Sequence, residues 1–272
     1  MSVPSLPLND GHSIPQLGLG TFGLWHEQGA TAVETAIGLG YRQLDTAVRY
    51  DNEEAVGEGI RRSGVDRSEL FVTTKLDGEF QGEDRALAGL RGSLQRLRLD
   101  YVDLLLIHWP LPQRGQFVST WRTFERLKAE GLVRSIGVSN FTPAHLEVLA
   151  AETSTVPAVN QIQLSPAITR VAQRAYNAAH GIVTQSWSPL KGILDEPVLL
   201  QIAGKHGKTT GQVVLRWHLQ NALVAIPKSA DPRRLAENLD VLDFELDGAD
   251  LAAIATLDRG PSAGVDSDVE GH

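Results

Sequence analysis

The chain has 272 residues, 42% of them hydrophobic, which suits a globular domain with a large core. Its net charge of −8 argues against non-specific nucleic-acid binding, and the absence of cysteine excludes disulfides, thiolate metal sites and a cysteine nucleophile. Residues 1–10 lack the basic start and apolar run of a secretory signal, and the most apolar run, 102–107, is too short to cross a bilayer, so we expect a cytoplasmic protein with no membrane or nucleic-acid partner.

An Asp-Gly turn at residues 10–11, set between short apolar segments, predicts a β-hairpin at the start of the chain. Beyond it, short apolar runs alternate with longer stretches of helical periodicity. We expect strands at residues 17–21, 43–47, 71–75, 102–108, 135–139, 159–163, 182–187 and 224–228. We expect helices at residues 30–39, 53–62, 84–97, 120–130, 143–151, 171–180, 197–206, 211–220 and 233–239.

This alternation predicts parallel strands joined by right-handed crossovers. Eight such units in a chain of this length predict an α/β fold, a (β/α)8 TIM barrel with an N-terminal β-hairpin and extra helices. An open doubly wound sheet is the alternative. No linker or composition break divides the chain, so we expect a single domain over residues 1–272, with a flexible tail at 258–272.

Several polar residues fall at or near the carboxyl ends of the expected strands. Barrel enzymes build their active sites on that face, whereas an open sheet would need these residues at one switch point. Their placement therefore favours the barrel and marks one end of it as the candidate site. The residues are Asp45, Lys75, His108, Ser139, Gln161 and Trp187.

Four residues, Asp45, Tyr50, Lys75 and His108, form a candidate catalytic set. A lysine or histidine at the end of a buried strand is costly unless it is paired, and Asp45 can hold Lys75 as an ammonium. That charge can lower the pKa of Tyr50 from about 10 toward the working pH of a proton donor. His108 can bond a substrate oxygen or the phenol. Each residue alone is commonly structural, but the four together favour proton transfer to a reduced carbonyl.

Three glycine motifs do not fit nucleotide binding. The pair at 18 and 20 lacks a third glycine, and the pair at 57 and 59 lies inside an expected helix. The segment 207–209 resembles the end of a phosphate-binding loop, but Ile202 stands where that loop needs a glycine. No zinc-ligand spacing occurs, so we expect no metal.

The motifs around the candidate residues are specific. They are LDTAVRY at 44–50, TTKL at 73–76, LIHWP at 106–110, IGVSNF at 136–141, AVNQI at 158–162, SWSPL at 186–190 and IPKS at 226–229. On these motifs the chain resembles the aldo-keto reductases from about residue 4 to residue 257, and within them the bacterial 2,5-diketo-gluconate reductase branch.

The resemblance implies an enzyme that reduces aldehydes or ketones to alcohols with NADPH, which would lie extended across the C-terminal mouth of the barrel. It implies that Tyr50 is the general acid, that His108 orients the carbonyl, and that the Asp45–Lys75 pair tunes Tyr50. The partner would be a small carbonyl compound, and the family uses no metal. Since relatives are often monomers, we expect a monomer.

The positions implied for the cofactor also suit it physically. Trp187 offers a flat face for the nicotinamide. The basic cluster of Lys228, Ser229 and Arg234 suits a 2′-phosphate, which favours NADPH over NADH. The predicted cofactor residues are Thr21, Phe22, Asp45, Ser139, Asn140, Gln161, Trp187, Ser188, Leu190, Lys228, Ser229, Arg234, Glu237 and Asn238.

Four residues, Phe22, Trp25, Arg49 and Trp109, are predicted to flank the substrate. The aromatic rings suit ketoaldehydes and aryl carbonyls, whereas Arg49 suits a keto-sugar acid. Ser165, the loop at 191–195 and the tail from 259 depart from the family pattern. The substrate therefore stays open.

Two other functions stay open as well. A Schiff-base aldolase would use Lys75 as nucleophile, but that chemistry needs an uncharged lysine and Asp45 would keep it charged. A nucleotide-binding protein without turnover would keep the same fold. Such a protein would often lack one member of the catalytic set, and here all four are present.

Overall fold

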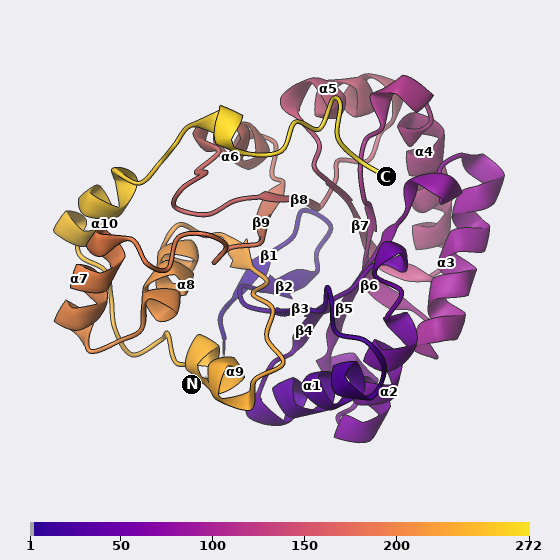
Figure 1. The fold of residues 1–272 in the computed structure, drawn as a ribbon. Coiled ribbons are helices and arrows are strands. Elements are labelled where there is room, and N and C mark those ends of the chain that lie inside the picture. Colours follow the sequence, from indigo (N-terminus) through magenta and orange to yellow (C-terminus); the bar gives the residue numbers. More distant parts are fainter. Residues whose placement is uncertain (1–2) are drawn as a thin grey trace.

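The computed structural model describes residues 3–272. Within them, eight parallel strands form one sheet in which each strand lies beside its neighbours in the chain, and Figure 1 shows helices surrounding that sheet. All eight expected strands are confirmed. They are β3 (Leu19–Gly20), β4 (Gln43–Asp45), β5 (Phe71–Leu76), β6 (Val102–Ile107), β7 (Val133–Ser139), β8 (Val159–Gln163), β9 (Val183–Trp187) and β10 (Val224–Ala225).

The sheet closes on itself, so the open-sheet alternative is wrong. Leu17 forms a parallel bridge with Ala225, and the amide of Gly18 donates to the carbonyl of Ala225 at 2.9 Å. The two ends of the sheet approach closely at this seam. A Cβ at Gly20 would lie 2.7 Å from the carbonyl oxygen of Ile226, so the seam needs glycine there.

Helices form the outer layer, and all nine expected ones are confirmed. They are α1 (His26–Leu39), α2 (Glu53–Ser63), α3 (Glu83–Leu97), α4 (Phe117–Ala129), α5 (Pro143–Glu152), α6 (Val171–Ala179), α7 (Pro197–His206), α8 (Thr210–Gln220) and α9 (Pro232–Leu239). The helix α10 (Gly248–Ala255) was not predicted individually, although extra helices were. Asp247 caps it by accepting hydrogen bonds from the amides of residues 249 and 250.

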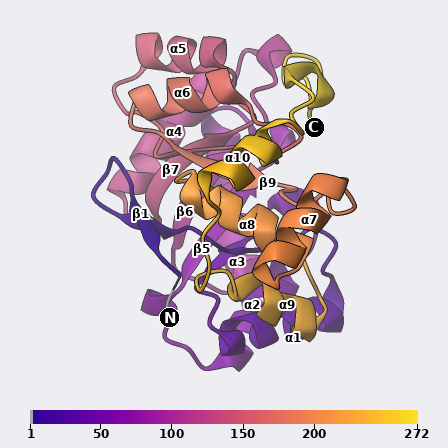
Figure 2. The ribbon, with the colours of Figure 1, turned by 90° about the vertical axis from the view of Figure 1, so that its left-hand side faces the viewer.

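The expected N-terminal hairpin is present as β1 (Ser5–Pro7) and β2 (Ser13–Pro15), paired antiparallel. Its residues Leu8 and Ile14 are buried in one cluster with Phe71 and Leu104 from the barrel strands. The hairpin therefore closes one end of the barrel. Figure 2 shows β1 on the opposite side of the molecule from the other end of the chain. The mouth at the carboxyl ends of the strands stays open.

Residues 258–272 pack beside that mouth. The hydroxyl of Thr169 donates to Asp258 at 2.5 Å, the amide of Val265 donates to Gln163 at 2.8 Å, and His145 lies 2.9 Å from Asp268. The flexibility expected of this tail stays a prediction, because contacts in one conformation do not measure motion. The single-domain assignment also stays a prediction, and residues 1 and 2 lie outside the described part of the chain.

No helix within residues 3–272 combines the length and the apolar character needed to cross a membrane.

Candidate active site

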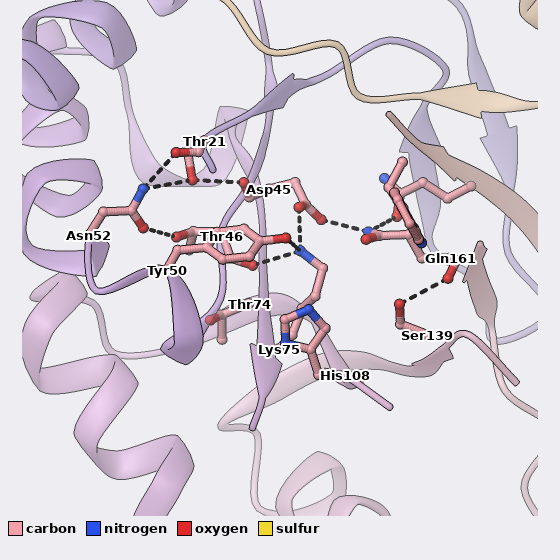
Figure 3. A network of polar contacts seen from close by, with 12 residues as sticks. Thr21, Asp45, Thr46, Tyr50, Asn52, Thr74, Lys75, His108, Ser139 and Gln161 are labelled. Atoms are coloured by element: carbon pink, nitrogen blue, oxygen red, sulfur yellow. Dashed lines mark hydrogen bonds and ion pairs between the residues drawn. The ribbon is translucent and has the colours of Figure 1, made fainter. Parts of the chain in front are cut away.

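The barrel brings the strand-end residues together at its mouth, as Figure 3 shows. Asp45 ends β4, Lys75 lies near the end of β5, and His108 directly follows β6. These three strands are consecutive and parallel, so their carboxyl ends meet on one face. Gln161 of β8 reaches the same centre from across the barrel, where its amide donates to Asp45 Oδ2 at 2.7 Å.

Lys75 is fully buried and forms an ion pair with Asp45. Its Nζ also donates to the carbonyl oxygen of Thr46 at 3.0 Å and to the Tyr50 hydroxyl at 3.2 Å. Burial disfavours the ammonium, but the charge of Asp45 and the contact with Tyr50 outweigh it and raise the pKa of Lys75. Lys75 is therefore a cation at neutral pH, held against the phenol oxygen.

Tyr50 lies in the short 3-10 turn Val48–Tyr50 that follows β4. The indole nitrogen of Trp25 donates to the Tyr50 carbonyl at 2.8 Å, and the ring of Phe22 meets the Tyr50 ring edge-on with centroids 5.2 Å apart. These contacts fix both the backbone and the ring, so the hydroxyl faces Lys75.

Asn52 supports this loop, and sequence reasoning missed its structural role. Its amide donates to the carbonyls of Thr21 at 2.7 Å and Leu24 at 3.0 Å, while its oxygen accepts from the Thr46 hydroxyl at 2.8 Å. The only local signal is an asparagine before a helix, which suggests a cap. The actual partners are distant in the chain, and no local pattern announces them.

The pKa of Tyr50 corrects one expectation. Burial raises the pKa of the phenol above its ordinary value of 10.0, and the Lys75 ammonium offsets only part of that effect. The prediction that Lys75 brings this pKa down toward neutral pH is therefore wrong. The ammonium acts in the predicted direction, but desolvation of the phenolate is the larger effect. Tyr50 is a phenol, and not a phenolate, throughout the neutral range.

His108 is buried beside the phenol, with ring centroids 5.8 Å apart. Burial, reinforced by the charge of Lys75, holds the pKa of His108 well below its ordinary value of 6.5. The imidazole is therefore neutral and can donate one hydrogen bond to an oxygen. The side chain of Asn140 donates to the His108 carbonyl at 3.0 Å and steadies its backbone.

A cavity of about 800 Å³ opens over this centre. The predicted residues that line it are Thr21, Phe22, Trp25, Asp45, Tyr50, His108, Trp109, Ser139, Asn140, Gln161, Trp187, Ser188, Leu190 and Lys228. The lining residues that were not predicted are Gly20, Gly23, Pro189, Lys191, Ile226, Pro227 and His272. Most of these adjoin predicted residues in the loops after β9 and β10, so position alone could have found them. His272 had no such signal.

Hydrogen bonds hold the side chains of one cavity wall in place. Asn140 has a left-handed backbone (φ 63°) that turns its side chain toward Trp187, whose indole nitrogen donates to it at 2.9 Å. The Ser139 hydroxyl donates to the carbonyl of Gln161 at 2.9 Å. Trp187 itself is half-buried, so the indole keeps an accessible face.

Five predicted cofactor residues follow β10, and they lie at the rim of the cavity or outside it. Lys228 lines the cavity and is exposed, whereas Ser229 is buried and its hydroxyl accepts from the amide of Asp231 at 3.0 Å. Arg234 is exposed on α9, 3.7 Å from Asp231. Glu237 and Asn238, also predicted to bind the cofactor, lie on the same helix outside the lining: Glu237 is 4.0 Å from Arg233, and Asn238 is buried. The cofactor roles of Ser229, Arg234, Glu237 and Asn238 stay predictions.

Arg49, predicted to meet the substrate, is not in the cavity lining. Its side chain is 59% exposed and lies 3.9 Å from Asp77. A substrate role for Arg49 stays a prediction that needs the side chain to turn inward.

The chain was compared with known proteins. A family model described as the aldo/keto reductase family matches residues 16–259. The chain is 46% identical to methylglyoxal reductase DkgA of Escherichia coli over 97% of this chain and 96% of that one, and 48% identical to 2,5-diketo-D-gluconic acid reductase B of Corynebacterium sp. over 95% of each. A crystal structure of a Gox0644 mutant in complex with NADPH matches with a TM-score of 0.95 and 44% identity over 100% of both chains.

Proposed function

The chain belongs to the aldo/keto reductase family, and from this premise we propose that it reduces small aldehydes and ketones with NADPH, with Tyr50 as the proton donor. The contact that carries the proposal is the one from Lys75 Nζ to the Tyr50 hydroxyl at 3.2 Å. It couples the only buried lysine of the described residues to a phenol that lines the cavity.

The residues of the chain divide the chemistry as follows. His108, neutral and beside the phenol, donates a hydrogen bond that orients the carbonyl oxygen. Tyr50 gives its proton to that oxygen as negative charge develops there. The Lys75 ammonium, held by Asp45, stabilises the charge left on the phenol oxygen. Because its pKa is raised, Tyr50 stays protonated over the whole neutral range and can act as the acid there.

The cavity fits NADPH in size and in the chemistry of its donors. Its volume of about 800 Å³ lies within the range of about 300–1,000 Å³ common for ligand sites. Trp187 offers an aromatic face, Asn140 and Gln161 offer amides, and Lys228 offers a cation at the rim. When bound, NADPH supplies the hydride that adds to the carbonyl carbon. Arg234, near that rim on α9, is the residue we assign to the 2′-phosphate.

The substrate face is aromatic. Phe22 is 65% exposed and Trp25 is 47% exposed at the mouth, and Trp109 lines the cavity next to His108. Exposed aromatic side chains beside a catalytic centre favour ketoaldehydes and aryl carbonyls. The names of the two relatives point to a ketoaldehyde and a keto-sugar acid, and Arg49 would serve the second if it turned inward.

The test is NADPH consumption with methylglyoxal, phenylglyoxal, an aryl aldehyde, a β-keto ester and a diketo-gluconate, with NADH in parallel. We expect turnover with NADPH that falls about 10²–10⁴-fold in Tyr50→Phe while NADPH binding stays unchanged. An undiminished rate in Tyr50→Phe would remove Tyr50 from the acid role.

The Schiff-base aldolase is disfavoured because the pKa of Lys75 is raised, and such a nucleophile must be uncharged. Borohydride trapping of a keto substrate on Lys75 would support the aldolase instead. A binding protein without turnover would bind NADPH and consume none with any substrate of the panel.

A further inference from the structure

Three metal-binding side chains meet at the edge of the cavity, next to the catalytic centre. Asp77 directly follows β5, and His108 directly follows the neighbouring strand β6. His272 arrives from the tail 258–272, and its ring meets the His108 ring edge-on with centroids 4.8 Å apart. One ligand atom from each of the three lies within 4.8 Å of the other two.

Each of the three side chains also has a buried polar atom without a partner. Asp77 Oδ1, His108 Nδ1 and His272 Nε2 are all buried atoms with no hydrogen bond. Asp77 is only 3% exposed and His108 only 6% exposed. Leaving one such atom unpaired is costly, and three that converge indicate a missing ligand. Arg49 does not satisfy Asp77, because its nearest approach is 3.9 Å, to the other carboxylate oxygen.

Two imidazoles and one carboxylate are a typical ligand set for zinc, with a fourth position left open. Tetrahedral bonds of about 2.0–2.1 Å would bring the ligand atoms to about 3.3 Å from one another. His272 Nε2 and Asp77 Oδ1 are already 3.7 Å apart, and the longest separation in the cluster, 4.8 Å at most, needs to shorten by about 1.5 Å. The flexibility predicted for the tail would allow that movement.

We propose that Asp77, His108 and His272 bind a divalent cation of the zinc type, and that the ion fastens the tail across the mouth and reversibly inhibits the enzyme. Sequence reasoning could not find this site, because zinc signatures place their ligands at short spacings and these three residues come from separate segments. This proposal departs from the expectation of no metal, and the ion would take no part in the reduction itself.

The contacts of the tail explain how a bound ion would inhibit the enzyme. The amide of Gly78, beside Asp77, donates to His272 O at 3.2 Å, and the Trp109 and His272 rings have centroids 6.0 Å apart. His272 thus already lines the cavity beside His108. An ion shared with Asp77 and His108 would hold it there and restrict exchange of substrate and product. The binding half of the inference stands by itself, and the inhibition half rests on the proposed function.

The test uses the full chain and zinc chloride in a non-coordinating buffer at neutral pH. Calorimetry without NADPH measures binding, and initial rates with saturating NADPH measure inhibition, each variant being compared with its own zinc-free rate. We expect one site, inhibition that a chelator reverses, and a rise of at least about tenfold in both zinc constants in His272→Gln and Asp77→Asn. His12→Gln, which removes an exposed histidine on the hairpin, should behave as the unaltered chain.

Three results would overturn the inference. They are the absence of zinc binding, binding that His272→Gln leaves unchanged, and binding at this site without inhibition of an active enzyme. Failure of the proposed function would look different: zinc would bind and the His272→Gln variant would lose it, while no substrate of the panel was turned over with or without zinc. Magnesium, which prefers oxygen ligands, should leave the rate unchanged.

Discussion

Replacing Lys75 by methionine tests how strongly the buried ion pair supports both the fold and the site. The substitution leaves the carboxylate of Asp45, 1% exposed, with the amide of Gln161 but without its counter-ion. Removing one partner of a buried pair costs about 3–5 kcal/mol. We expect the free energy of unfolding to fall by that amount, and kcat to fall by about 10² or more, since the charge on the Tyr50 oxygen loses its neighbouring cation.

The assay is equilibrium unfolding in urea, followed by circular dichroism and tryptophan fluorescence, with two matched variants beside Lys75→Met. The double variant Asp45→Asn/Lys75→Met removes both charges and should be more stable than Lys75→Met alone. Lys205→Met removes a half-exposed lysine paired with the exposed Asp247 and with the buried Asp250, which keeps His206 as a partner, and should cost less than Lys75→Met. The reasoning is refuted if Lys75→Met is as stable as Lys205→Met, or if the double variant is less stable than the single one.

Three further predictions concern the cofactor and pH. Arg234→Ala should weaken NADPH about 10–100-fold and NADH hardly at all in fluorescence titrations, and equal losses would undo the phosphate assignment. The kcat for reduction should stay level from about pH 6 to 9, because the pKa of Tyr50 is raised and that of His108 is lowered; a step inside that range would contradict both. Burial lowers the pKa of His218 to about 4 in the folded chain. Below pH 6.5, His218 is therefore protonated in the unfolded chain while it stays neutral in the folded chain. Stability should fall by up to about 3 kcal/mol between those values, and His218→Gln should lose that part of the fall; an identical fall in both would refute the assignment.

The fold could be predicted largely because each strand is short, apolar and followed by a helical stretch, so local patterns carried the topology. The candidate catalytic residues were located for the same reason, since Asp45, Lys75 and His108 each stand at or near a strand end. Closure of the barrel was predicted from the number of units and the placement of polar residues, but the contact that closes it was not, because it joins Leu17 to Ala225, which lie far apart in the chain. Asn52 was missed as a loop support because its partners are backbone carbonyls reached only in the folded chain.

The pKa of Tyr50 shows where residue types stop predicting chemistry. Sequence reasoning supplied a cation beside the phenol and its direction of effect, but the balance depends on desolvation, which only the packed site reveals. In the proposed mechanism, a raised pKa keeps Tyr50 in the phenol form, which is the form that can give a proton to a carbonyl oxygen. The same group would have to lose that proton before it could act as a base on an alcohol.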